Sequence, residues 1–166
     1  MIVYFLIIVG FLMRLVPHVP NMAPIAAIAI FSGAYLNKKI VPWVPLAIMI
    51  ASDLIIGMHD VVLYTWGAFI VIGFFGMRLR ENRSPVRIFK ITITSALFFF
   101  AVSNLGVWIA WYPNTWAGLT QCYVNAIPFL RNTMVSNVLF SFAFFGIYEY
   151  AKKAFRNYKY KTVLLT

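Results

Sequence analysis

Polar residues that could bind a small molecule occur at the ends of several apolar segments. The connection after the first segment reads Arg-Leu-Val-Pro-His-Val-Pro-Asn and contains Arg14, His18 and Asn21. Asp53 lies inside a later apolar segment, where a carboxylate is costly unless it faces a cavity or a partner. Together these side chains can donate and accept hydrogen bonds. We therefore treat them as a candidate site for a polar ligand.

Further candidates lie in neighbouring connections. His59 and Asp60 belong to a turn that follows the Asp53 segment. Four of the five tryptophans fall on the same predicted side as these loops, and Trp43 alone falls on the other. An interfacial belt populates both interfaces, so this asymmetry favours a pocket with aromatic walls, although a belt remains an alternative for each single ring. The other predicted substrate-binding residues are Tyr64, Asn104, Trp108, Gln121 and Asn125.

Arg14 and Asp53 allow two interpretations. Both lie near the predicted outer end of an apolar segment, so they could form an ion pair that holds the first and third segments in register. They could also contact a ligand directly. The two roles are compatible, and the sequence leaves both open.

The sequence lacks the residues that several kinds of catalytic chemistry require. A phosphate-binding P-loop ends in Gly-Lys-Ser/Thr, and the sequence contains no Gly-Lys pair. It has no HExxH motif, and two histidines with the single Cys122 are too few for a self-contained zinc site of the usual kind. We expect Cys122 to be a small apolar residue. We therefore expect no enzymatic activity, no metal and no cofactor.

The composition predicts an integral membrane protein. Hydrophobic residues make up 63% of the 166 residues and charged residues 11%, against roughly 25% charged in an average soluble domain. We expect one six-helix membrane domain over residues 1–155 and a basic tail over 156–166. Over 117–130 we expect a short amphipathic helix that lies at the interface or folds over the mouth of the bundle. The six apolar segments are 1–16, 22–36, 40–58, 61–77, 88–111 and 132–150.

The basic residues predict the orientation. If the six segments alternate across a membrane, only Arg14 and Arg131 fall on the outer side. The positive-inside rule then places both termini in the cytoplasm. This placement accounts for the formal net charge of +10 by topology and attraction to anionic lipid, without a nucleic-acid partner. The inner basic residues are Lys38, Lys39, Arg78, Arg80, Arg83, Arg87, Lys90, Lys152, Lys153, Arg156, Lys159 and Lys161.

Small residues repeat along the second segment. Ala23 and Ala27 form an AxxxA pair, and Ala29 and Gly33 form an AxxxG pair. Such spacing lets another helix approach closely. We predict that these four residues contact a partner helix, either inside the bundle or on a separate membrane subunit.

Six short helices, two inner termini, an outer polar loop and the AxxxA pair of Ala23 and Ala27 resemble the substrate-binding S-component of energy-coupling factor vitamin transporters. The Arg14–Asn21 run, with Ser52, Asp53 and the Gly57-Met-His59 turn, is similar to an uncharacterised bacterial six-helix family that we associate with these S-components. The resemblance implies a bacterial cytoplasmic-membrane protein that captures a vitamin or a similar small molecule. It also implies a transmembrane coupling protein and cytoplasmic ATPases as partners.

Two other functions are compatible with the sequence. Rod-shape-determining membrane proteins of similar size are scaffolds, and a scaffold would scatter its outer polar and aromatic residues over the surface. A substrate-binding subunit would bring them together. A solitary transporter that needs no ATPase is the third possibility. The few outer charges and many aromatic residues favour a flat, neutral or weakly charged ligand.

Overall fold

The computed structural model describes residues 2–17 and 19–163, and all regular structure in these ranges is helical. Six helices follow one another, which confirms the all-helical class. Two of them, α5 and the Trp116–Arg156 part of α6, are long and apolar enough to cross a membrane, and the other four are shorter apolar helices. The helices are α1 (Ile2–Leu15), α2 (Ile25–Tyr35), α3 (Trp43–Ile56), α4 (Val62–Met77), α5 (Pro85–Trp111) and α6 (Trp116–Val163).

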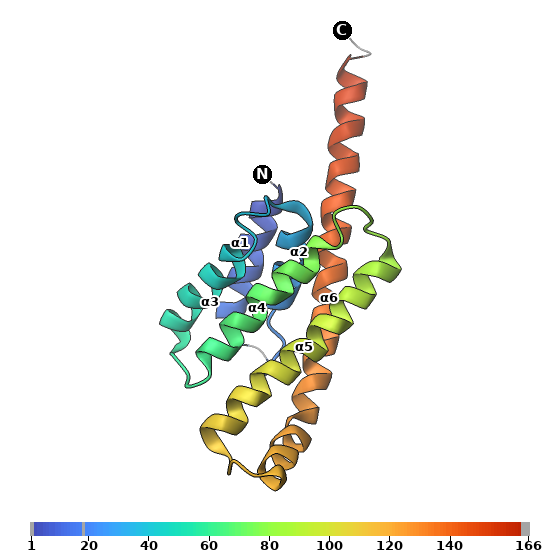
Figure 1. The fold of residues 1–166 in the computed structure, drawn as a ribbon. Helices are drawn as coiled ribbons and strands as arrows, with labels where there is room; N and C mark the ends of the chain where they lie inside the picture. The colour runs from blue at the N-terminus through green and yellow to red at the C-terminus, as the bar shows by residue number, and fades with distance from the viewer. Residues whose placement is uncertain (1, 18, 164–166) are drawn as a thin grey trace.

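The connections alternate between the two ends of the bundle (Figure 1). The α2–α3 and α4–α5 connections lie at the end where α1 begins, and the α3–α4 and α5–α6 connections lie at the opposite end. The predicted inner basic residues therefore share one end. The predicted ligand-binding loops share the other.

Local sequence explains several helix boundaries. Pro24 and Pro42 directly precede α2 and α3, where a missing backbone donor costs nothing. Ser84 caps α5 by accepting a hydrogen bond from the backbone N–H of Arg87, with Pro85 as the first helical residue. Gly57 ends α3 with φ of 122°, a backbone conformation that favours glycine.

Helix α2 is the centre of the bundle and contacts all five other helices. Ala27, Ala29 and Gly33 are buried within the chain. A Cβ atom added to Gly33 would lie 2.2 Å from the backbone oxygen of Gly73 in α4, so the two helices touch backbone to backbone. Of the two alternatives that the sequence left open, Ala27, Ala29 and Gly33 therefore follow the one inside the bundle and not the contact with a separate subunit, because helices of the same chain cover them. Ala23 is partly exposed and lines a cavity instead.

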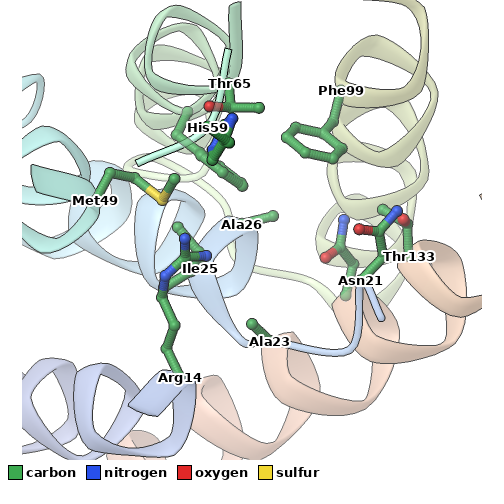
Figure 2. Close-up of a pocket in the computed structure, with 12 residues that line it drawn as sticks. Arg14, Asn21, Ala23, Ile25, Ala26, Met49, His59, Thr65, Phe99 and Thr133 are labelled. Atoms are coloured by element: carbon green, nitrogen blue, oxygen red, sulfur yellow. The ribbon is translucent and has the colours of Figure 1, made fainter. Parts of the chain in front are cut away.

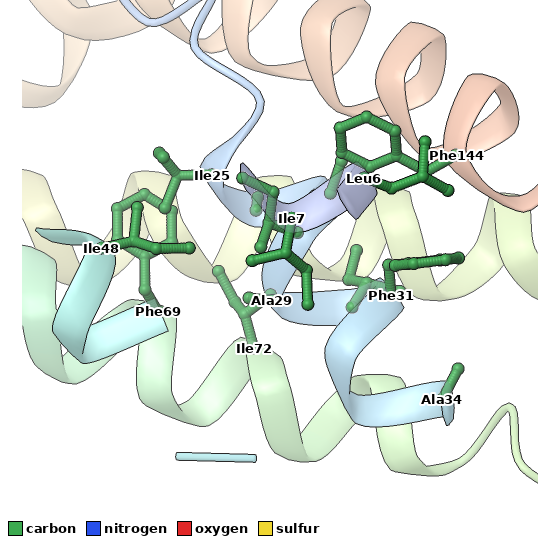
Figure 3. Close-up of a cluster of buried hydrophobic side chains, with 14 of the residues drawn as sticks. Leu6, Ile7, Ile25, Ala29, Phe31, Ala34, Ile48, Phe69, Ile72 and Phe144 are labelled. Atoms are coloured by element: carbon green, nitrogen blue, oxygen red, sulfur yellow. The ribbon is translucent and has the colours of Figure 1, made fainter. Parts of the chain in front are cut away.

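The core is built around α2, as Figure 3 shows. Phe31 is fully buried, and its ring lies 5.4 Å from the ring of Phe145 and 5.9 Å from that of Phe144 on α6. Burying a side chain of this size contributes about 1.5–3 kcal/mol. Leu6 and Ile7 of α1 pack on the same cluster. These contacts fix α1 and α6 against the central helix.

Helix α6 is longer than the sequence analysis predicted. It runs without a break through Pro128, so the predicted separate interfacial helix over 117–130 is wrong: this stretch is the first part of α6. A proline removes one helical hydrogen bond but does not always end a helix in an apolar environment, where neighbouring groups compensate. The basic tail likewise continues α6, to Val163.

Large apolar side chains cover the outside of the bundle. Leu54 is 71% exposed, Leu63 is 77% exposed and Trp116 is 84% exposed. Large exposed apolar side chains suit a surface that contacts lipid or another protein. It agrees with the apolar character of all six helices.

Candidate functional site

A buried ion pair lies where α1 and α3 meet. One terminal nitrogen of Arg14, Nη2, donates to Oδ1 of Asp53 at 2.6 Å, and Nε donates to the Ser52 hydroxyl at 2.7 Å. The indole N–H of Trp66 on α4 donates to the other carboxylate oxygen, Oδ2, at 2.7 Å. The Asp53 side chain is 2% exposed. Charge-assisted hydrogen bonds from two helices therefore compensate a carboxylate that would otherwise be costly to bury.

The pair answers part of the question that the sequence left open. Arg14 and Asp53 do pair, and they join α1 to α3. Arg14 also lines the adjoining cavity (Figure 2), so its guanidinium can contact a molecule bound there. Asp53 is not among the lining residues. Its observed contacts hold Arg14 in place.

His59 extends this cluster toward the α3–α4 connection. Its Nε2 lies 3.9 Å from Oδ2 of Asp53, too far for a hydrogen bond. The turn at Gly57 redirects the chain after α3 and places the imidazole beside Thr65 of α4 (Figure 2). The ring is partly exposed. It can therefore donate to or accept from a bound molecule.

The inner cavity, as we name it, has a volume of about 180 Å³. Figure 2 shows side chains from several helices and from the α1–α2 connection pointing toward this common space. Its polar lining residues are Arg14, Asn21, His59, Thr65, Thr133 and Asn137. Its apolar wall consists of Ala23, Ile25, Ala26, Met49, Phe69 and Phe99.

The two hydroxyl groups in this lining already donate hydrogen bonds to backbone carbonyls. Thr65 donates to the carbonyl of Val62 at 3.0 Å, and Thr133 donates to the carbonyl of Phe129 at 2.9 Å. Their oxygen lone pairs can therefore accept from a ligand. Asn137 is 2% exposed, and its Nδ2 has no hydrogen-bond partner among the described residues. A buried donor without a partner is uncommon and calls for an explanation.

An outer cavity of about 400 Å³ adjoins the inner one. The two share Asn21, His59, Thr65 and Phe99 in their linings. The outer cavity adds Asn104 of α5 and Asn125 of α6. Because the two cavities share these four lining residues, we regard them as one site with a narrow inner part and a wider outer part.

Asn21 occupies the junction of the two cavities. Its backbone adopts φ of 61°, in the left-handed region that asparagine tolerates better than most residues. Asn132 of α6 donates to the carbonyl of the preceding Pro20 at 3.2 Å. This bond ties the α1–α2 connection to α6.

The structure does not bring every predicted residue to the site. Tyr64 packs beside Gly106 of α5, and Gln121 is exposed without lining either cavity. Trp108 lines a different surface cleft with Trp116.

Of the two remaining predicted residues, Asp60 lies apart from the cavity linings. Asp60 accepts a hydrogen bond from the indole N–H of Trp111 at 3.0 Å, and Trp111 itself lines the outer cavity. His18 lies outside the described residues. The sequence therefore located the correct end of the bundle but not every side chain that faces the cavity.

Sequence reasoning missed Thr65, Thr133 and Asn137. A signal existed for the two α6 residues: Thr133, Asn137 and Ser141 recur every four residues in an otherwise apolar helix, and this spacing places them on one face. Trp66 was also missed as a partner of Asp53. Arg14 and Trp66 both donate to the Asp53 carboxylate, but they lie far apart in the sequence, so the sequence does not indicate that they share this partner.

The arrangement suits binding. Within the described residues, no group of three His, Cys, Asp or Glu side chains could hold a metal ion. The polar groups of the cavity are amides, hydroxyls, an imidazole and a paired guanidinium. These groups can fix the orientation of a small ligand that packs against the apolar half of the lining.

Comparison with known proteins places the chain in a family. Residues 1–160 match a family of unknown function, DUF6580, and the chain belongs to this family. No curated protein and no solved structure matches it. The family description states no activity.

Proposed function

We propose that this member of the DUF6580 family is a multi-pass protein of the bacterial cytoplasmic membrane that binds a small molecule from the outer side for uptake. In this proposal the chain crosses the membrane six times, and both termini are cytoplasmic. It acts as a substrate-binding subunit similar to the S-component of an energy-coupling factor transporter.

The observation that carries the proposal is the two-part cavity. Residues from the α1–α2 connection, the α3–α4 connection and helices α1, α4, α5 and α6 converge on it. Convergence of polar and aromatic groups is what substrate binding requires, whereas a scaffold would scatter them. The buried Nδ2 of Asn137, which has no hydrogen-bond partner among the described residues, adds a donor that a bound molecule could satisfy.

The arrangement of charge supports the orientation. The described connections rich in Lys and Arg lie at the end opposite the cavity (Figure 1). By the positive-inside rule that end is cytoplasmic, so the cavity faces outward. The short helices α1 to α4 are compatible with a locally thinned bilayer.

Energy for uptake would come from other subunits. The sequence has no Gly-Lys pair and hence no P-loop, so we propose a transmembrane coupling protein and cytoplasmic ATPases as partners. The exposed apolar side chains of the bundle provide surface for lipid and for such a partner.

The test is a ligand screen on the purified protein in detergent. Thermal unfolding is measured against a broad library of water-soluble metabolites, because a ligand at 100 times its Kd adds about 2.7 kcal/mol to the stability of the folded state. We expect at least one compound to raise the Tm. The effect should disappear in a His59→Ala/Asn21→Ala double variant, since both side chains line both cavities.

The matched control is Gln121→Ala, which lies at the same end of the bundle but lines neither cavity. It should retain the full shift. No shift with any compound would refute the proposed function, and so would shifts that persist in the double variant. Co-purification with other cell-envelope proteins in the absence of any ligand would favour a scaffold.

A further inference from the structure

The size of the inner cavity limits what can enter it. Its volume is about 180 Å³, and a cavity of roughly 150 Å³ holds one benzene molecule. The inner cavity therefore has room for a single six-membered ring with one small substituent. Two fused rings would have to extend into the outer cavity.

The charge of the lining favours a neutral molecule. Among the described lining residues, Arg14 is the one permanently cationic side chain, and Asp53 compensates it at 2.6 Å. No Asp or Glu side chain is among these described lining residues. A bound carboxylate would have to compete with Asp53 for the guanidinium, and it would add a second negative charge beside the Asp53 carboxylate, which is 2% exposed and repels it.

The walls suit a flat ring. Phe69 and Phe99 stack with their centroids 4.8 Å apart and their planes 27° from parallel. Both line the cavity, together with the flexible Met49. Aromatic faces and a thioether make favourable contacts with another ring.

Two hydrogen-bonding groups of α6 indicate which substituent the ring of the ligand carries. Asn137 offers an N–H donor that has no partner within the described chain. One turn earlier on the same face, the Thr133 hydroxyl has already donated its proton and can only accept. A donor and an acceptor four residues apart on a helix are neighbours. Their complement is a group with an adjacent carbonyl and N–H.

We propose that the inner cavity binds a neutral, single-ring molecule that carries an amide or lactam group. The ligand carbonyl accepts from Asn137, the ligand N–H donates to Thr133, and the ring lies against Phe69 and Phe99. This assignment rests on the proposed function, since it names the substrate class of the same site.

The test uses pairs of probes that share a ring but differ in charge. Binding to the full chain in detergent is measured by thermal shift and calorimetry for benzamide against benzoate and for uracil against orotate. The two-ring 1-naphthamide is added as a size control. We expect benzamide and uracil to bind more tightly than their anionic partners, and 1-naphthamide to bind more weakly than benzamide.

A variant pair separates ligand contact from a structural role. Asn137→Leu removes the donor but keeps a side chain of similar size, and we expect amide binding to weaken about tenfold or more. Ser141→Ala removes another buried, unpaired polar group of α6 that lies outside the cavity, and we expect binding to stay unchanged. Without ligand, Asn137→Leu should be at least as stable as the natural protein, because it relieves an unsatisfied buried donor.

The outcomes distinguish this inference from the proposed function. Tighter binding of benzoate or orotate would overturn it, as would unchanged amide binding in Asn137→Leu. Failure of all the single-ring amides, while the metabolite screen yields a larger or charged ligand, would overturn this inference and leave the proposed function standing. A metabolite screen without any ligand would overturn both.

Discussion

Breaking the Arg14–Asp53 pair should destabilise the protein far more than breaking a similar contact on its surface. In Arg14→Met the Asp53 carboxylate stays 2% exposed and keeps only the Trp66 hydrogen bond among the contacts described above. In Asp53→Leu the guanidinium loses its counter-ion while its side chain is 16% exposed. Removing one partner of a buried pair costs about 3–5 kcal/mol, so we expect each single variant to lose about that much.

The double variant Arg14→Met/Asp53→Leu should behave differently. Both charges are absent, and the replacements fill a similar volume with apolar atoms, a change that is often neutral or even stabilising relative to the buried pair. We therefore expect the double variant to lose less stability than the two single variants together, with a coupling energy of about 2–3 kcal/mol.

The assay is unfolding in mixed micelles as the fraction of denaturing detergent rises, followed by tryptophan fluorescence. Trp66, one of the five tryptophans, donates to Asp53 and contributes to this signal. The matched control is Asp60→Asn, because Asp60 also accepts from an indole, Trp111, but is exposed. Its loss should cost less than about 1 kcal/mol. Equal effects of Asp53→Leu and Asp60→Asn, or additive single effects, would refute the reasoning.

Three further predictions concern packing and topology. Gly76→Ala should cost about 1–3 kcal/mol, because its added Cβ would lie 2.2 Å from the backbone oxygen of Ile30; Gly67→Ala on the same helix meets nothing within 4 Å and should stabilise by up to about 1 kcal/mol. Detergent unfolding measures both, and equal effects would contradict the close approach of α2 and α4. Phe31→Ala should cost about 3–5 kcal/mol, since Phe31 is fully buried; a loss below 1 kcal/mol, measured in the same way, would argue against the α2-centred core. In a background without the native cysteine, Lys39→Cys should react with a membrane-impermeant maleimide only after the membrane is opened, and Asn114→Cys should react in intact cells, because the two exposed positions lie at opposite ends of the bundle. The reverse labelling pattern would contradict the proposed orientation.

Part of the candidate site was predictable because its residues are costly in apolar segments. Asp53 and Arg14 stand out for this reason, and the structure joins them at 2.6 Å. Asn21 and His59 stand out as polar residues of connections at the same end, and both line both cavities.

Other residues were ambiguous for an equally physical reason. Tyr64 and Trp108 are aromatic residues at a predicted interface, where a ring can face lipid, a neighbouring helix or a pocket. Which of these it faces depends on the rotation of its helix. In the structure Tyr64 packs on Gly106 and Trp108 lines a separate cleft.

The sequence by itself determined the all-helical class and the grouping of basic residues in alternate connections. These properties follow from composition and local periodicity, which need no long-range information. Tertiary structure decided that the small residues Ala27, Ala29 and Gly33 pack inside the chain, and that Asn137 lines a cavity with its Nδ2 unpaired within the part of the chain that the structure describes. Both depend on how each helix is rotated about its axis and on which neighbours cover it. Rotation and coverage are fixed by contacts between residues far apart in the chain, such as Gly33 with Gly73, and the local pattern of one helix cannot specify them.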